Sequence, residues 1–326
     1  MTHPAATVAK ERKYPFVNMK ISDYSILTEI QDRSPCFKCG KSRKYFCYTC
    51  YVPIEQLCDR IPKVKLPVKV DIIKHPSEIG KSTAVHGPIL APEDVQIFTY
   101  PDIPDYSKEE GVVLIFPCAT SLTISQLFDA NVRTVRRDGF DVPKGYNMGT
   151  LLKVRLEEKR EQSDRQEPES LEQYSIDSLP IKKAVFIDST WNQSRGIYKD
   201  DRINCMKSVV LQNRISQFWR HQKGSPRWYL ATIEAIHQFV LEVHINAWGL
   251  DRSYRGLDEL EISEGYMAAV EAAGKIRDVD PSVPADTRTA PYKGQYDNLL
   301  YFFAHMYDLI HIYYDHNELK SYKRPI

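Results

Sequence analysis

Short apolar runs alternate along this chain with segments whose apolar residues recur at helical spacing. Three runs are rich in branched or aromatic residues and are bounded by turn residues, which predicts buried strands. A fourth alternates apolar and charged residues, which predicts a half-exposed strand. The expected strands cover residues 64–73, 111–116, 185–187 and 209–211, and the expected helices cover 125–130, 232–243 and 298–314. Strands that alternate with helices favour an α/β domain with a mostly parallel sheet.

The polarity of the chain divides it into three parts. Residues 1–30 are polar and predict a flexible N-terminal arm, while residues 31–60 hold a compact cysteine module. Residues 61–326 form the main domain, which is interrupted at 155–179 by a segment of Glu, Arg, Gln, Ser and Asp. A segment with so few apolar residues buries too little surface to order itself, so we expect a solvated insertion.

Composition narrows the class of protein. The chain has 326 residues, of which 42% are hydrophobic, so it can bury a sizeable core. Its formal net charge is +1, so any RNA binding must come from local basic patches. No apolar stretch approaches the roughly 20 residues that span a bilayer, and the N-terminus lacks the apolar segment of a secretory signal. We expect an intracellular protein with no membrane segment and no obligate protein partner.

Four of the seven cysteines follow the spacing of a zinc site. Cys36 and Cys39 form one CxxC pair, and Cys47 and Cys50 form another seven residues later. Two such pairs can place four thiolates tetrahedrally around Zn²⁺, and four sulfurs close the site, so we expect a structural ion. Two reactive thiol pairs, or coincidental surface cysteines, are the alternative. The loop over 40–46 is basic and aromatic, which suits either RNA contact or a solvated loop. The remaining cysteines are expected to be ordinary buried thiols: Cys58, Cys118 and Cys205.

The strongest candidate for chemistry is Asp188, which ends the strand over 185–187. Ligand sites of α/β folds lie at the carboxyl ends of the strands. Thr190 and Trp191 follow, so a carboxylate, a hydroxyl and an indole emerge together. The alternative makes Asp188 the N-cap of the next helix and Trp191 a core residue.

Other polar segments accompany this motif. Residues 74–78 and 82–90 contain two histidines and a carboxylate near a strand end. A metal site or an acid–base role is the alternative, but we expect His75, which precedes Pro76, to stabilise a turn. Phosphate or substrate contact by Ser82 and Thr83 stays open. Thr232 is expected to cap the helix over 232–243 and leave backbone N–H groups free for an anion. Glu234 in the same turn would otherwise complement the helix dipole. The segment over 218–224 combines cations with aromatic residues in a predicted loop.

Taken together, these motifs resemble the DTW-domain tRNA-uridine aminocarboxypropyltransferases from about Cys36 to the last helix. The segments that carry the resemblance are CFKC (36–39), CYTC (47–50), KHPSE (74–78), STAVH (82–86), IFP (115–117), IDSTWNQSR (187–195), FWRHQKG (218–224), TIEAI (232–236) and KGQYDNLL (293–300). Ala231 departs from the serine that is usual before Thr-Ile-Glu in this family. The resemblance implies a SPOUT-like knotted α/β domain, S-adenosylmethionine as donor, and N3 of a uridine in the tRNA D-loop as acceptor. It also favours a nuclear location.

With this chemistry, Asp188 is the candidate catalytic base that takes the N3 proton, and tRNA is the expected partner. The candidate donor-binding residues are Pro117, Thr190, Trp191, Thr232, Ile233 and Glu234. The candidate tRNA contacts are Lys44, Arg195, Lys199, Arg220, His221 and Lys223. The zinc ligands would be Cys36, Cys39, Cys47 and Cys50. A SPOUT-type RNA methyltransferase and a non-catalytic zinc-containing RNA-binding protein are the alternatives. No Gly-x-Ser-x-Gly motif supports a hydrolase.

Overall fold

A six-stranded sheet forms the centre of the molecule in the computed structural model, which describes residues 14–78, 80, 82–129, 174–212, 214–279 and 288–325. The strands lie in the order β6-β5-β9-β7-β10-β8 and every neighbouring pair is parallel. They are β5 (Lys69–Lys74), β6 (Val95–Thr99), β7 (Val112–Ile115), β8 (Leu122–Thr123), β9 (Lys183–Asp188) and β10 (Lys207–Val210). The predicted α/β class and mostly parallel sheet are therefore confirmed.

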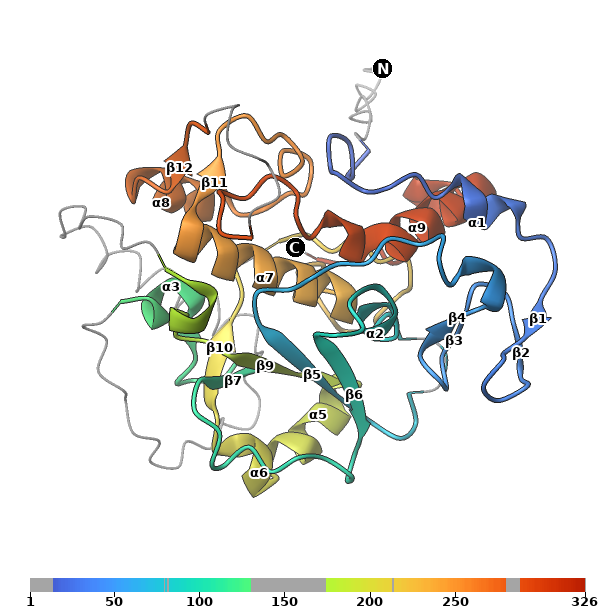
Figure 1. Ribbon diagram of the computed structural model, residues 1–326, viewed down its shortest axis with the longest axis horizontal. Helices are drawn as coiled ribbons and strands as arrows, with labels where there is room; N and C mark the ends of the chain where they lie inside the picture. The colour runs from blue at the N-terminus through green and yellow to red at the C-terminus, as the bar shows by residue number, and fades with distance from the viewer. Residues whose placement is uncertain are drawn as a thin grey trace, which may run out of the picture.

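Helices cover both faces of this sheet (Figure 1). The long helix α7 (Thr232–Trp248) packs on one face with α2 (His86–Leu90) and α3 (Ile124–Leu127), whereas α5 (Trp191–Tyr198) and α6 (Asp201–Asn204) lie on the other. Side chains of a strand alternate between faces. In β9, Ala184 and Phe186 join the core under α7, while Val185 joins the core under α5.

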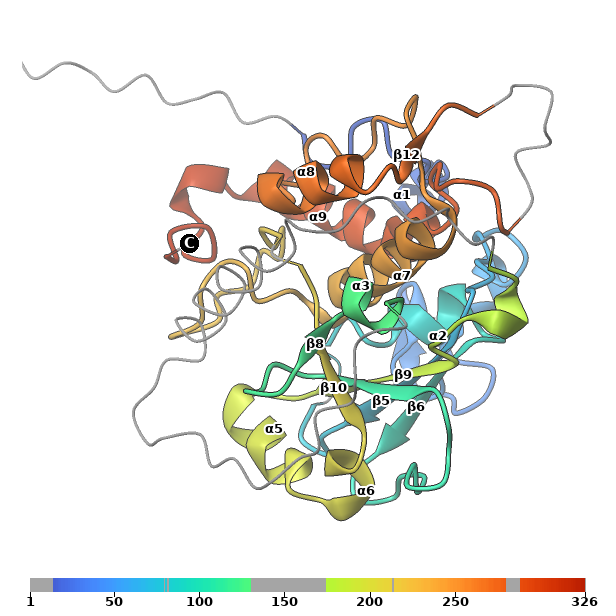
Figure 2. The same cartoon turned by 90° about the vertical axis from the view of Figure 1, so that its left-hand side faces the viewer.

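The remaining elements surround this centre. Figure 2 shows α8 and α9 stacked beyond α7, away from the sheet. These elements are α1 (Ser25–Glu29), β1 (Ser34–Pro35), β2 (Ser42–Arg43), β3 (Phe46–Cys47), β4 (Val52–Pro53), η1 (Glu55–Leu57), η2 (Ile176–Ser178), β11 (Leu250–Asp251), α8 (Glu264–Ala272), β12 (Ile276–Arg277), η3 (Asp297–Leu300), α9 (Tyr301–Tyr313) and η4 (His316–Glu318). Among the described residues, no helix is both long and apolar enough to cross a membrane.

Most strands and helices predicted from the pattern are present, with shifted ends. The prediction of a half-exposed strand over 64–73 is wrong. The strand of this segment, β5, begins at Lys69, lies between β6 and β9, and is buried on both faces. The helix expected over 125–130 is the four-residue α3. The last helix is confirmed as η3 followed by α9. The knot implied by the family resemblance stays a prediction.

Two of the predicted segment boundaries also change. Residues 14–30 do not form a loose arm, because Phe16 and Leu27 are buried in the main core and the backbone N–H of Lys20 donates to Asp297 (2.6 Å). Most of the expected insertion, 155–173, lies outside the described residues. Its last residues are ordered, since Leu179 is buried and the indole of Trp248 donates to the carbonyl of Tyr174 (2.6 Å).

Candidate active site

Asp188 is the last residue of β9 and its side chain lies on the α7 face of the sheet. It has the same parity as Ala184 and Phe186, and it is 7% exposed. Its Oδ1 accepts hydrogen bonds from the hydroxyls of Ser82 (2.8 Å) and Thr232 (2.7 Å). Its Oδ2 is buried and has no hydrogen-bond partner within the described part of the chain.

This environment raises the pKa of Asp188. Burial is the largest cause, and the hydrogen bonds from Thr232 and Ser82, together with the positive charge of Lys74, offset it in part. Lys74 is the residue of β5 that pairs with Asp188 in the sheet register. A buried carboxylate that accepts too few hydrogen bonds to stabilise its negative charge is a stronger proton acceptor than a solvated aspartate.

The N-terminus of α7 presents Thr232 to this carboxylate. The N-cap is Ala231, with φ −66° and ψ 153°, so the expectation that Thr232 caps the helix is corrected: Thr232 is its first helical residue. The side chain of Ala231 has no acceptor atom, and Glu234 supplies part of the missing cap by accepting from the backbone N–H of Ala231 (2.9 Å). Glu234 also accepts from the hydroxyl of Ser216 (2.6 Å), so its carboxylate is used inside the protein.

The helix after β9 is capped by Thr190 and not by Asp188. Gln193 accepts from both the backbone N–H (3.0 Å) and the hydroxyl (2.8 Å) of Thr190. Asp188 is therefore free of the capping role that the alternative interpretation gave it. Trp191 begins α5 half-buried, with its ring centroid 4.4 Å from that of Tyr229.

Asp188 lines a cavity of about 750 Å³, a volume in the range of small-molecule sites. A second chamber of about 180 Å³ adjoins it and has mainly apolar walls that include Phe116, Trp191 and Tyr229. Six residues line both spaces: Ile187, Ser189, Trp191, Tyr229, Leu230 and Thr232. A polar space that holds a buried acid thus continues into an aromatic one.

The structure brings most of the sequence-predicted site residues together around these spaces. Asp188, Thr190, Arg195, Arg220, His221 and Lys223 line the larger cavity, Pro117 lines the chamber, and Trp191 and Thr232 line both. Ile233 and Glu234 are fully buried and line neither, and Lys199 lines neither as well. The segment that carries the four cysteines, residues 36–51, is called the cysteine loop below. Lys44 belongs to it and lines a separate cavity.

Sequence reasoning missed two residues of the site. Tyr229 packs against Trp191 and lines both spaces, and the adjacent pair Trp228-Tyr229 just before a predicted helix was the available signal. Lys74 was not singled out, although its place at the end of β5 next to Asp188 follows from pairing the two strands. Ser82, for which substrate contact was left open, instead donates to Asp188.

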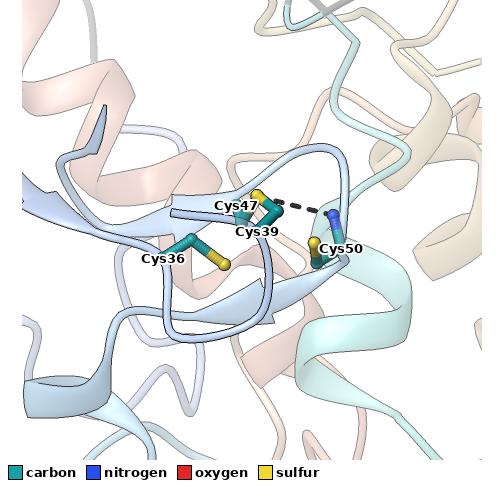
Figure 3. Close-up of side chains that lie close together, drawn as sticks. All are labelled: Cys36, Cys39, Cys47 and Cys50. Atoms are coloured by element: carbon teal, nitrogen blue, oxygen red, sulfur yellow. Dashed lines mark hydrogen bonds between the residues drawn. The ribbon is translucent and has the colours of Figure 1, made fainter. Parts of the chain in front are cut away.

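The four cysteines of the N-terminal module converge as predicted (Figure 3). Their sulfur atoms all lie within 4.8 Å of one another, and Cys39 Sγ is 3.6 Å from Cys47 Sγ. Tetrahedral Zn–S bonds of about 2.3 Å require sulfurs roughly 3.8 Å apart. Burial acts against ionisation of Cys47, but hydrogen bonds from Arg43 and from the backbone of Cys50 and Thr49 lower its pKa to about 6. The donor set fits a closed four-thiolate site.

The other three cysteines are not the buried thiols that we expected. Cys58 and Cys118 are partly exposed, and Cys205 is exposed. Cys58 follows η1, Cys205 follows α6, and Cys118 lies in the loop between β7 and β8.

Comparison with known proteins identifies the family. Residues 44–311 match the DTW domain, and the chain belongs to the DTW domain family. It is 38% identical over 298 residues to tRNA-uridine aminocarboxypropyltransferase 1 of Xenopus tropicalis, covering 90% of this chain and 85% of that protein. The proteins of the same name from Mus musculus and Homo sapiens are each 37% identical, covering 95% of this chain and 88% of theirs. No solved structure matches the chain.

Proposed function

We propose that this protein transfers the 3-amino-3-carboxypropyl group of S-adenosylmethionine to N3 of a uridine in the tRNA D-loop. The observation that carries the proposal is the buried Asp188 carboxylate, whose Oδ2 lacks a partner beside a cavity of ligand size. The names of its relatives in the DTW domain family, tRNA-uridine aminocarboxypropyltransferase 1, support the same reaction.

The two adjoining spaces suit the donor. It carries an aromatic base, a sulfonium cation and an amino-acid end, and aromatic rings bind the first two by stacking and cation–π attraction. Trp191, Tyr229 and the segment at Phe116-Pro117 supply such surfaces. Thr232 and Thr190 offer hydroxyls to the polar end, while Ile233 and Glu234 hold the first turn of α7 in place behind them. When bound, the donor supplies an electrophilic γ-carbon and a thioether leaving group.

Asp188 acts as the general base. The N3–H proton of uridine passes to its carboxylate, a new bond joins N3 to the γ-carbon, and the electron pair of the carbon–sulfur bond leaves with sulfur as 5′-methylthioadenosine. The nitrogen of a neutral N3–H group is a poor nucleophile. A general base that removes its proton in the transition state therefore increases the rate of transfer about 10²–10⁴-fold. Ser82 and Thr232 fix the orientation of the carboxylate, and the protein selects the γ-carbon over the methyl group by position.

The rim of the larger cavity faces the RNA in this proposal. Arg195, Arg220, His221 and Lys223 line it, and exposed cations at such a rim bind phosphates. Lys199, at the end of α5, and Lys44, beside the cysteine loop, extend the contact. A uridine in a loop can leave its stack and enter the site without the cost of opening a duplex.

Zinc is the ion that we propose for the four cysteines. It would stabilise the loop that carries Lys44, with no part in the transfer, because four sulfurs leave no open coordination position. The nuclear location implied by the resemblance also stays a prediction, to be tested by imaging the tagged protein.

Two labelled donors test the reaction. The purified protein is incubated with unmodified tRNA and with S-adenosylmethionine labelled either in the aminocarboxypropyl chain or in the methyl group, and nucleosides are analysed by mass spectrometry. We expect label from the chain and none from the methyl group on uridine. Methyl label would establish the methyltransferase alternative, and donor-independent RNA binding with no label would establish the non-catalytic one.

A further inference from the structure

A third cavity, of about 220 Å³, lies between the cysteine loop and the active site. It shares four lining residues with the larger cavity: Ser82, Thr83, Phe218 and Arg220. The two spaces therefore adjoin at the loop that orients Asp188. A ligand with one end at Asp188 can extend directly into this third cavity.

The walls of the third cavity combine cations with aromatic rings. Arg33, Lys44 and Arg220 carry positive charge, and Tyr48 and Trp219 are among the aromatic residues, whereas no carboxylate is among its lining residues. Proteins bind unstacked nucleotides with this combination, since rings stack on bases and cations bind phosphates.

A buried polar group at the same cavity also lacks a partner. His86 lines it and is 4% exposed, and its ring packs against those of Phe46 (centroids 5.3 Å apart) and Phe302 (5.6 Å), which also contact each other (4.9 Å). Its Nδ1 has no hydrogen-bond partner among the residues that the structure describes. Burial and the charge of Arg220 lower the pKa of His86 to about 3, so the ring adds no positive charge to the wall of this cavity.

The cysteine loop contacts the active-site strands and loops at two points near this cavity. A Cβ on Gly80 would lie 3.1 Å from the ring of Tyr48, so the loop that carries Ser82 passes tightly against that ring. Lys74, which pairs with Asp188 in the sheet register, donates to the hydroxyl of Tyr51 (2.9 Å). The cysteine loop thus forms one wall of a space that continues to the catalytic carboxylate.

We propose that the third cavity binds the nucleotide next to the target uridine, so that the cysteine loop helps to select which uridine reaches Asp188. The proposal rests on the function proposed above, because it takes tRNA as the substrate. One nucleotide enters the site, its neighbour occupies the third cavity, and the connecting phosphate passes Arg220.

The test compares two variants with matched controls in binding to tRNA transcripts. Y48L removes an aromatic wall and R33E reverses a charge, while Y313L and R255E change exposed residues that line none of the three cavities. We expect Y48L to weaken RNA binding about tenfold, as loss of one stacked base does. R33E should reduce the slope of affinity against salt by about one. The donor affinity of Y48L and R33E, and the RNA affinity of the two control variants, should stay within twofold of wild type.

A set of transcripts with one abasic D-loop nucleotide at a time identifies the bound base. We expect one abasic position beside the target to weaken wild type about tenfold and Y48L less than twofold. Equal losses in both proteins, or wild-type binding by Y48L and R33E, would overturn the proposal. The unfolding midpoint and zinc content of Y48L show whether the cysteine loop is intact in this variant. If the loop is disturbed, the RNA affinity of R33E tests the proposal in its place. Absence of transfer by wild type that still binds RNA would refute the proposed function without affecting this comparison.

Discussion

Replacement of Asp188 by asparagine separates its proposed catalytic role from its structural one. Asparagine keeps an Oδ1 acceptor for Ser82 and Thr232 and places an amide where the buried Oδ2 has no partner. The base is lost, so we expect kcat to fall by about 10²–10⁴, which is roughly 3–5 kcal/mol of transition-state stabilisation. The dissociation constant of the donor should change less than threefold.

The D188N substitution should lower activity without lowering the stability of the folded protein. The pKa of Asp188 is raised in the folded protein, mainly by burial, so the unfolded chain loses this proton at lower pH than the folded one. Its contribution to stability is therefore lost as pH rises from the unfolded pKa through the folded pKa. At neutral pH the D188N protein should unfold at the same temperature as wild type or higher.

The assay measures transfer under single-turnover conditions by nucleoside mass spectrometry, with donor binding by calorimetry. The wild-type rate should rise with pH on an acid limb that lies above that of an ordinary aspartate, and D188N should lack this limb. D200N is the matched control, because Asp200 caps α6 and lines neither active-site cavity. A D188N rate within threefold of wild type at normal donor affinity would refute the base assignment.

Three further predictions concern the groups around this carboxylate. T232V removes one of its two donors, so the pKa of Asp188 should rise further and the acid limb of the rate should move to higher pH; an unchanged profile contradicts the hydrogen bond. W191A removes an aromatic wall of the chamber and should weaken donor binding about tenfold in calorimetry, with tRNA affinity retained; equal donor affinity would place the adenine elsewhere. C39S should lower zinc content, measured by atomic absorption, and the unfolding midpoint together, and a full-strength metal signal in the variant would exclude the four-thiolate site.

The sequence predicted the centre of the sheet and the position of the acid because both follow from local patterns. Branched residues before Asp188 identify β9, and a strand end in an α/β fold identifies a ligand edge. Four cysteines in two CxxC pairs likewise identify their own cluster. These signals need no knowledge of distant contacts.

The rest depended on contacts between distant segments. The burial of Asp71 in β5 follows from the neighbouring strands β6 and β9, because a charged residue can be buried where partners such as Lys183 and Tyr106 meet it. Phe16 appeared to lie in a polar arm, yet α9 supplies aromatic residues that bury it. The role of Ser82 required the folded position of a loop 106 residues away from Asp188.

The alternation of β9 has a consequence for how this enzyme can diverge. Deleting or inserting a single residue before Asp188 within the strand would rotate the acid to the α5 side; an insertion would present Ile187 to Thr232 instead, and a deletion would present Ser189. Two residues would restore the face but move the carboxylate about 6–7 Å along the strand, beyond reach of both hydroxyls. The contacts of Asp188 therefore require a fixed spacing between the paired part of this strand and its terminal aspartate.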